Sequence, residues 1–154
     1  MSHNGPTVRD VSMALRELVQ GWERYREAVA DELGVGTSEV ITLGYLYHDG
    51  PRTPSEIGQR LNLTSGSVTA LLDRLEAAAY VTRSQNPDDR RSLLATATPA
   101  GRHAIQWFYE QIDATVAEAL HSAPQLARTD IIRFSTAAGE GLAQQAQTTK
   151  EDNQ

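Results

Sequence analysis

The chain has 154 residues, no cysteine and a formal net charge of −6 at pH 7. This length predicts one domain that buries most of its apolar surface on folding. The lack of cysteine excludes disulfides, thiolate metal sites and peroxide sensing through a thiol. No apolar run approaches the ~20 residues of a membrane span and no basic-then-apolar signal opens the chain, so we expect a cytoplasmic protein that does not bind a membrane.

Residues 7–35 predict a long first helix. Its apolar residues recur at alternating spacings of three and four, which is a heptad-like stripe: Val8, Val11, Leu15, Leu18, Trp22, Tyr25 and Val29. Such a stripe requires a partner helix. Residues 1–6, which precede it, are polar and are expected to be flexible.

A second helix is predicted over Thr37–Asp49, capped at its start, and a third begins soon after it. The expected buried residues of the second helix are Val40, Ile41, Leu43 and Leu46. The tetrapeptide Thr53-Pro54-Ser55-Glu56 has the form of a capping box, with Pro at the first helical position, where its missing N–H costs nothing. We therefore expect a short helix from this point, with Ile57 and Leu61 on its inner side.

Asn62-Leu63 predicts a tight turn before another hydroxyl cap at Thr64. In the helix that follows, one stripe is apolar and must be buried: Val68, Leu71, Leu72 and Leu75. The small residues at its N-terminal end then face outward: Ser65, Gly66, Ser67, Thr69 and Ala70. A helix fits the major groove of B-DNA, and small side chains let its backbone approach the base edges.

A hairpin with a basic tip is predicted next. Residues 81–83 and 93–96 are β-prone, and Asn86-Pro87-Asp88-Asp89 between them is rich in turn formers. Arg90 and Arg91 follow at the tip, where they can reach a DNA minor groove. Thr98-Pro99 repeats the cap-plus-Pro pattern and opens another helix.

Two further apolar stripes lie in residues 99–147 and predict two more helices. They consist of Ile105, Phe108, Ile112, Val116 and Leu120, and of Ile131, Phe134, Ala138, Leu142 and Ala146. With the first helix, these would form an intertwined dimerisation domain, although an ordinary monomeric bundle is the alternative. The polar residues 148–154 are expected to be a flexible tail.

The segment LTSGSVTALLDRLEAAAYVTRSQNPDDRRSLLATATPAG resembles the MarR (multiple antibiotic resistance regulator) family. The resemblance implies a homodimeric, mainly α fold with a small β-hairpin wing. A winged helix-turn-helix over residues 37–98 would be flanked by dimerisation helices at 7–35 and 99–147, and a small ligand often relieves repression. The chain departs from the family pattern at three positions, where Ala79 replaces Gly, Tyr80 replaces an aliphatic residue and Ala97 replaces Leu.

The expected DNA-binding residues follow from these elements and from the resemblance. On the recognition helix they are Thr64, Ser65, Gly66, Ser67, Thr69, Ala70 and Arg74; on the wing they are Arg83, Asp89, Arg90 and Arg91; Arg52 and Arg60 are expected to bind phosphates. The family motif implies that Asp89 positions the arginine beside it. Residues 52–102 contain seven arginines and five acidic residues, a balance of +2, so the remainder carries −8. The basic part would orient the protein on DNA.

A ligand cleft is a further expectation. In the fold that the resemblance implies, aromatic residues gather between the dimerisation helices and the winged helix-turn-helix: Trp22, Tyr25, Tyr45 and Tyr47, with His48 beside them. Core packing is the ordinary role of such residues. Glycine-rich phosphate loops, nucleophile motifs and paired zinc histidines are lacking, so we expect no enzyme activity, cofactor or metal.

The function that these features predict is a homodimeric, sequence-specific regulator of transcription. It would bind a pseudo-palindromic operator in double-stranded DNA, as a repressor that a small aromatic or amphipathic effector releases. Two alternatives stay open: a winged-helix module that binds another protein, and a ligand-binding dimer that has lost affinity for DNA.

Overall fold

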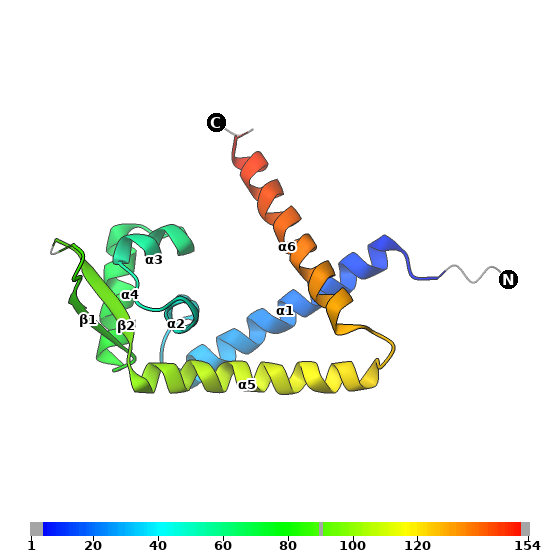
Figure 1. The fold of residues 1–154 in the computed structure, drawn as a ribbon, viewed down its shortest axis with the longest axis horizontal. Coiled ribbons are helices and arrows are strands. Elements are labelled where there is room, and N and C mark those ends of the chain that lie inside the picture. The colour runs from blue at the N-terminus through cyan, green and yellow to red at the C-terminus, as the bar shows by residue number, and fades with distance from the viewer. Residues whose placement is uncertain (1–4, 90, 152–154) are drawn as a thin grey trace. The chain divides into compact units, whose positions relative to one another are not determined.

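The computed structural model describes residues 5–89 and 91–151. The elements follow the predicted order: α1 (Val8–Leu33), α2 (Thr37–Asp49), α3 (Pro54–Leu61), α4 (Ser65–Ala77), β1 (Val81–Gln85), β2 (Leu93–Ala97), α5 (Pro99–Ser122) and α6 (Arg128–Glu151) (Figure 1). The predicted fold class, mainly α with a small hairpin wing, is confirmed. None of the described helices is long and apolar enough to cross a membrane.

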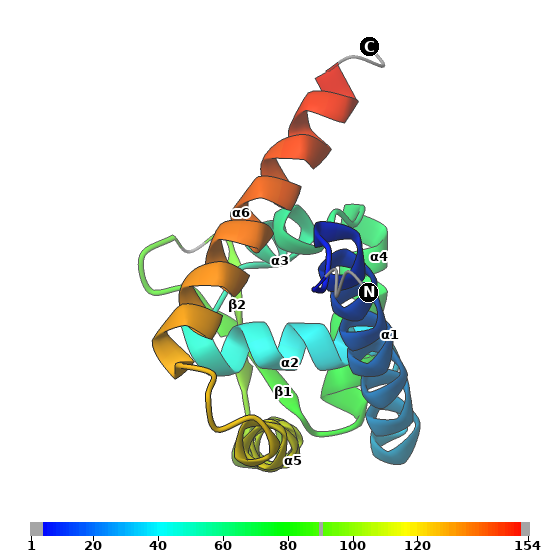
Figure 2. The same ribbon diagram turned by 90° about the vertical axis from the view of Figure 1, so that its right-hand side faces the viewer.

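The chain divides into two compact units, residues 1–109 and 110–154. In the first unit α2 lies at the centre and contacts α1, α4 and β2 (Figure 2). The largest side chains that are fully buried come from α2, α3, α4 and α5: Leu43, Ile57, Leu71, Leu72, Leu75 and Ile105. This core holds the helix-turn-helix and its hairpin together.

The caps at the starts of α3, α4 and α5 are present as predicted. The capping box at Thr53 is present, because its side chain accepts from the Glu56 N–H while the Glu56 carboxylate accepts from the Thr53 N–H. Thr64 caps α4 by accepting from the Ser67 N–H, and Thr98 accepts from the Gly101 N–H at the start of α5. Hydrogen bonds from these side chains satisfy amides that a helix start leaves open.

Helix α2 differs from the prediction in two details. Its N-cap is Gly36, which makes no side-chain capping hydrogen bond, and Ile41 is 41% exposed rather than buried. Val40, Leu43 and Leu46 are buried as expected. A helix whose neighbours leave a cavity along one side exposes the residue on that side, and Ile41 lines such a cavity.

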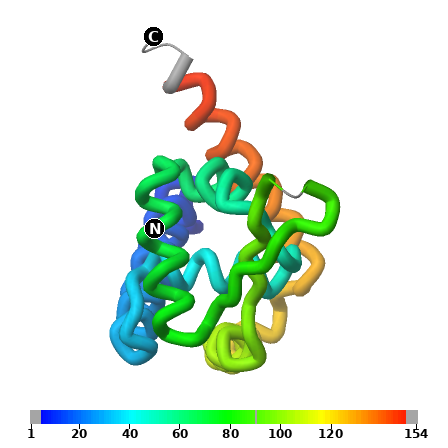
Figure 3. Tube along the Cα trace, turned by 90° about the vertical axis from the view of Figure 1, so that its left-hand side faces the viewer, coloured from blue at the N-terminus to red at the C-terminus, as the bar shows by residue number. Residues whose placement is uncertain are grey.

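The hairpin pairs Val81 with Ala97 and Gln85 with Leu93 in antiparallel register. Arg52, before α3, adds an isolated bridge to Ala95, with its N–H donating over 3.1 Å to the Ala95 carbonyl and its carbonyl accepting over 2.8 Å. Through this bridge the segment leading into α3 is tied to the wing. Figure 3 views the unit from this side, with α4 on the left and the hairpin on the right.

The second unit consists of the C-terminal part of α5, from Glu110 onward, and the whole of α6. Among its described side chains none is buried. Helix α6 continues to Glu151, so residues 148–151 of the expected tail are helical. Long helices without buried side chains gain little stability from their own chain.

Ala79 carries a strained backbone conformation in the turn after α4. Its φ is 60°, and the Tyr80 N–H donates back to the Leu75 carbonyl over 2.9 Å, as in a glycine-terminated helix end. We expect Ala79→Gly to raise the free energy of unfolding by about 1 kcal/mol, because a left-handed conformation costs an L-residue roughly 1–2 kcal/mol. Denaturant unfolding measures this change.

The neighbouring residue provides the control. Ala78 has a φ of −79°, so Ala78→Gly relieves no strain and should lower the free energy of unfolding by up to about 1 kcal/mol. Equal effects of the two glycine substitutions would show that the backbone at Ala79 is not strained.

Candidate nucleic-acid interface and ligand cavity

The outer face of α4 carries the small residues that the sequence predicted there. Ser65, Gly66, Ser67, Thr69 and Ala70 are exposed, whereas Val68, Leu71, Leu72 and Leu75 are buried. The hydroxyls of Thr64 and Ser67 lie 2.9 Å apart, and the Thr69 hydroxyl donates to the Ser65 carbonyl over 3.0 Å. The first turns of α4 therefore present a low, partly polar surface that a flat or grooved partner can approach closely.

A groove of about 590 Å³ lies between α3 and α4, on the same side as this face. It is lined by Pro54, Ser55, Gly58, Gln59, Asn62, Leu63, Thr64, Ser65, Val68 and Thr69. Ser55 and Gln59 are exposed on α3 and were not among the predicted site residues. Their spacing of four, on the side of α3 away from Ile57, is the sequence signal that could have identified them.

Arg74 is engaged within the chain. Its Nε lies 2.6 Å and its terminal nitrogen 2.5 Å from Oε1 of Glu39, whose side chain is only 2% exposed. The Arg74 side chain itself is 59% exposed. The expected DNA-binding residue therefore has a structural partner on α2, 35 positions away in the sequence, which local spacing could not reveal.

Arg83, predicted as a wing residue for DNA, is also engaged within the chain. Its guanidinium lies 2.5 Å from Glu76 and 2.7 Å from Asp73, and its side chain is 24% exposed. The hydrogen bond from Arg83 lowers the pKa of Glu76, and the same contact raises the pKa of Arg83. Arg83 thus fastens β1 to the C-terminal half of α4.

The wing tip is shaped by side chains that bond to the backbone. Asn86 Oδ1 accepts from the Asp88 N–H and Asp89 Oδ1 accepts from the Arg91 N–H, each over 3.0 Å. The Arg91 side chain is exposed. Asp89 therefore acts on the backbone of the tip. Arg90, and with it the expected contact between its side chain and Asp89, lies outside the described residues.

Arg52 and Arg60 converge on one aromatic ring. Their guanidinium carbons lie 5.4 Å and 5.7 Å from the centre of the Tyr45 ring, within the range of a cation–π contact. Arg60 is exposed, so it can still reach an anion, whereas the Nε of Arg52 is buried and has no hydrogen-bond partner among the described residues.

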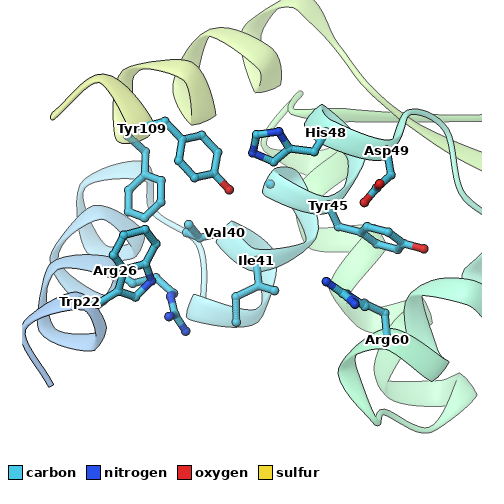
Figure 4. Close-up of a pocket in the computed structure, with 11 residues that line it drawn as sticks. Trp22, Arg26, Val40, Ile41, Tyr45, His48, Asp49, Arg60 and Tyr109 are labelled. Carbon is cyan, nitrogen blue, oxygen red and sulfur yellow. The ribbon is translucent and has the colours of Figure 1, made fainter. Parts of the chain in front are cut away.

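A cavity of about 390 Å³ adjoins Tyr45 in the same unit (Figure 4). Its walls come from α1, α2, α3 and α5: Trp22, Arg26, Val40, Ile41, Gly44, Tyr45, His48, Asp49, Arg60, Phe108 and Tyr109. Trp22, Tyr45 and His48 were predicted for it. A Cβ at position 44 would lie 2.7 Å from the Tyr109 hydroxyl, so the glycine makes room for that ring.

Two predicted cavity residues lie elsewhere. Tyr25 stacks on Phe108, with ring centres 5.4 Å apart, and Tyr47 packs against His48 at 5.1 Å; neither lines the cavity. In their place the cavity has Arg26 and Tyr109. Each of these follows directly after an apolar-stripe residue, and burial raises the pKa of the Tyr109 hydroxyl.

Comparison with known proteins shows which proteins this chain is similar to. The model of the MarR family matches residues 33–92, which run from the end of α1 to the wing. Over these residues the chain is similar to the MarR family. It is 38% identical over 82 residues to the uncharacterised HTH-type transcriptional regulator YcgE of Bacillus subtilis, covering 53% of each chain. The chain thus spans about half the length of these curated relatives.

Solved structures resemble the chain over most of its length. The transcriptional regulator Tm0710 from Thermotoga maritima superposes with a TM-score of 0.65 at 22% identity, covering 92% of this chain and 98% of the other. The MepR–DNA complex of S. aureus gives 0.53 at 22% identity, covering 72% and 98%. At such identity the likeness shows the fold alone.

Proposed function

We propose that the protein is a homodimeric MarR-family regulator that binds operator DNA through α4 and the wing. The observation that carries this proposal is the exposed face of α4, whose small side chains suit insertion into a major groove. The exposed Arg91 at the wing tip and the exposed Arg60 on α3 are cations that could bind phosphates. A DNA-bound state of the related MepR supports the same use of the fold.

The dimer is inferred from what the single chain leaves uncovered. Helix α6 exposes Ile132 at 65%, Phe134 at 47% and Leu142 at 72%, and α1 exposes Val8 at 84% and Leu18 at 66%. Apolar area of this extent left exposed on two helices is typical of an interface. A second copy of the chain is the occupant we propose, since two recognition helices are what a pseudo-palindromic operator requires.

Repression would follow from occupancy of the operator in the cytoplasm, and a small molecule in the cavity would relieve it. The cavity combines Trp22 and Tyr109 rings with the cations of Arg26 and Arg60. Aromatic walls and two guanidinium groups favour an aromatic anion such as a phenolic acid. The ligand acts only if it binds better to a dimer whose recognition helices are wrongly spaced.

The test of DNA binding is the affinity for a duplex as a function of salt. A dimer that neutralises several phosphates should lose affinity steeply between 50 and 200 mM salt, with a slope set by the number of contacts. Lack of binding even at low salt would refute the DNA-binding proposal and favour one of the two alternatives, a protein-interaction module or a ligand-binding dimer.

Arg91→Ala tests the wing. We expect weaker operator binding and a salt slope that falls by about 1 per chain, because one cationic contact is lost from each half-site. Stability should change by less than about 0.5 kcal/mol, since the side chain is exposed. Arg9→Ala, which removes one exposed charge from α1, is the control. A slope equal to that of the unaltered protein would exclude a DNA contact by Arg91.

Salicylate titrated into the preformed complex tests the switch. A coupling of roughly 1–3 kcal/mol would weaken DNA binding about 5- to 150-fold. In a Trp107→Phe background Trp22 is the remaining tryptophan and should report cavity binding by fluorescence. Arg26→Gln should abolish the response, and mild peroxide should release nothing in a chain without cysteine. Release by peroxide and by none of the anions would refute this mechanism.

A further inference from the structure

Glu39 is a buried carboxylate that the DNA-binding surface does not use directly. It lies in the first turn of α2 and is 2% exposed, and two nitrogens of the Arg74 guanidinium lie 2.5 and 2.6 Å from its Oε1. A Cβ at position 36 would lie 2.4 Å from its Oε2, so the carboxylate is accommodated by the lack of a side chain there. A buried charge requires a partner, because desolvation of an unpaired carboxylate costs several kcal/mol.

Arg74 lies near the C-terminal end of α4, and a second group of ion pairs holds the same part of the helix. Asp73 and Glu76 on α4 both contact Arg83 of β1. The helix is therefore fixed at one end by charge pairs to α2 and to the wing. Its other end carries Ser65, Gly66 and Ser67, which are exposed.

The exposed N-terminal end of α4 lies far along the helix from the Glu39–Arg74 pair. A small change in the helix angle at this pair therefore displaces the N-terminal end. Arg74 comes nine positions after Ser65, which is roughly 14 Å along the helix at 1.5 Å per residue. A tilt of about 5° at Arg74 moves the N-terminal end by roughly 1 Å, and hydrogen bonds to base edges tolerate only a few tenths of an ångström. Contacts to phosphates by long side chains adapt to such a shift more easily.

We propose that Glu39 is a positioning residue for DNA recognition: through Arg74 it sets the angle of α4, and discrimination between operator and other DNA depends on this pair. The inference rests on the proposed function. It also assigns Arg74 a role different from the direct DNA contact expected from sequence, since Arg74 cannot leave Glu39 without leaving a buried charge unpaired. The two roles predict opposite effects of neutralising Glu39.

The test is the ratio of the dissociation constants for a random duplex and for an operator selected by the unaltered protein, at one salt concentration. Glu39→Gln should lower this ratio about tenfold or more, the effect of misreading one base pair, while affinity for random DNA stays within about twofold. Glu32→Gln, which removes an exposed negative charge from α1, is the matched control and should leave the ratio unchanged.

A second variant keeps the test decisive if Glu39→Gln unfolds. Glu39→Leu combined with Arg74→Met removes both charges at once, a change that buried pairs often tolerate; it should fold and show the same loss of discrimination. An unchanged ratio in either folded variant would overturn the proposal. Tighter operator binding by Glu39→Gln would overturn it too, because a released Arg74 would then be a phosphate ligand. If the unaltered protein selects no operator, the proposed function fails, and this inference fails with it.

Discussion

Gly101→Ala should lower the free energy of unfolding by about 3 kcal/mol, at the upper end of the usual cost of overpacking. A Cβ at this position would lie 2.1 Å from the Tyr80 carbonyl oxygen and 3.0 Å from its carbonyl carbon, and these are backbone atoms that cannot rotate away. The Tyr80 carbonyl also accepts from the Thr98 N–H over 2.9 Å. The substitution would therefore separate the start of α5 from the turn that leads into the wing.

Thermal unfolding followed by circular dichroism measures this effect, with an expected drop of roughly 6–12 °C. The matched control is Gly66→Ala, because a Cβ there meets nothing within 4 Å. In the first turns of α4 it should raise the free energy of unfolding by up to about 1 kcal/mol. The same methyl group would lie on the exposed face of α4 that we propose enters the major groove. Operator affinity should therefore fall while the free energy of unfolding rises. Equal stability of the two variants would contradict the close approach at Gly101.

Placing charge on the apolar face of α6 should have the largest effect on DNA binding. Phe134→Glu combined with Leu142→Glu puts two carboxylates on the exposed apolar stripe where the proposed partner helix would pack, and a buried unpaired charge costs several kcal/mol. We expect a monomer at micromolar concentration. Losing the second half-site should weaken operator binding about 100-fold or more, because linked binding raises avidity by about 10²–10⁴.

Analytical ultracentrifugation measures the oligomeric state and fluorescence anisotropy measures the affinity for the operator. Gln145→Glu adds a charge to an exposed polar position of α6 and serves as the control; it should remain dimeric. A double variant that sediments as a dimer with unchanged affinity would show that this face of α6 is not the interface.

The local elements could be predicted because their signals are local. The capping box at Thr53, the cap at Thr64 and the apolar stripe of α4 depend on residues within one or two helical turns, and each appears as predicted. At Ala79, where the chain departs from the glycine of the family pattern, φ is positive.

The side-chain partners could not be predicted, because they join distant parts of the chain. Arg74 and Arg83 looked like free cations beside DNA, yet Glu39 is 35 positions from Arg74, and Asp73 and Glu76 reach Arg83 only once the hairpin has formed. The cavity shows the same limit. Tyr25 and Tyr47 were expected there from residue type, but which side of a helix faces a cavity depends on how neighbouring helices cross.

We propose that two copies of this chain bind one operator through paired α4 helices. The most direct test is selection of bound sites from random duplex DNA with the full chain, followed by sedimentation of the protein on the selected site. We predict an inverted repeat whose half-sites are centred roughly 34–36 Å apart, about one helical turn, with two chains bound. Recovery of no discrete site, or of an asymmetric site that binds a single chain, would contradict it.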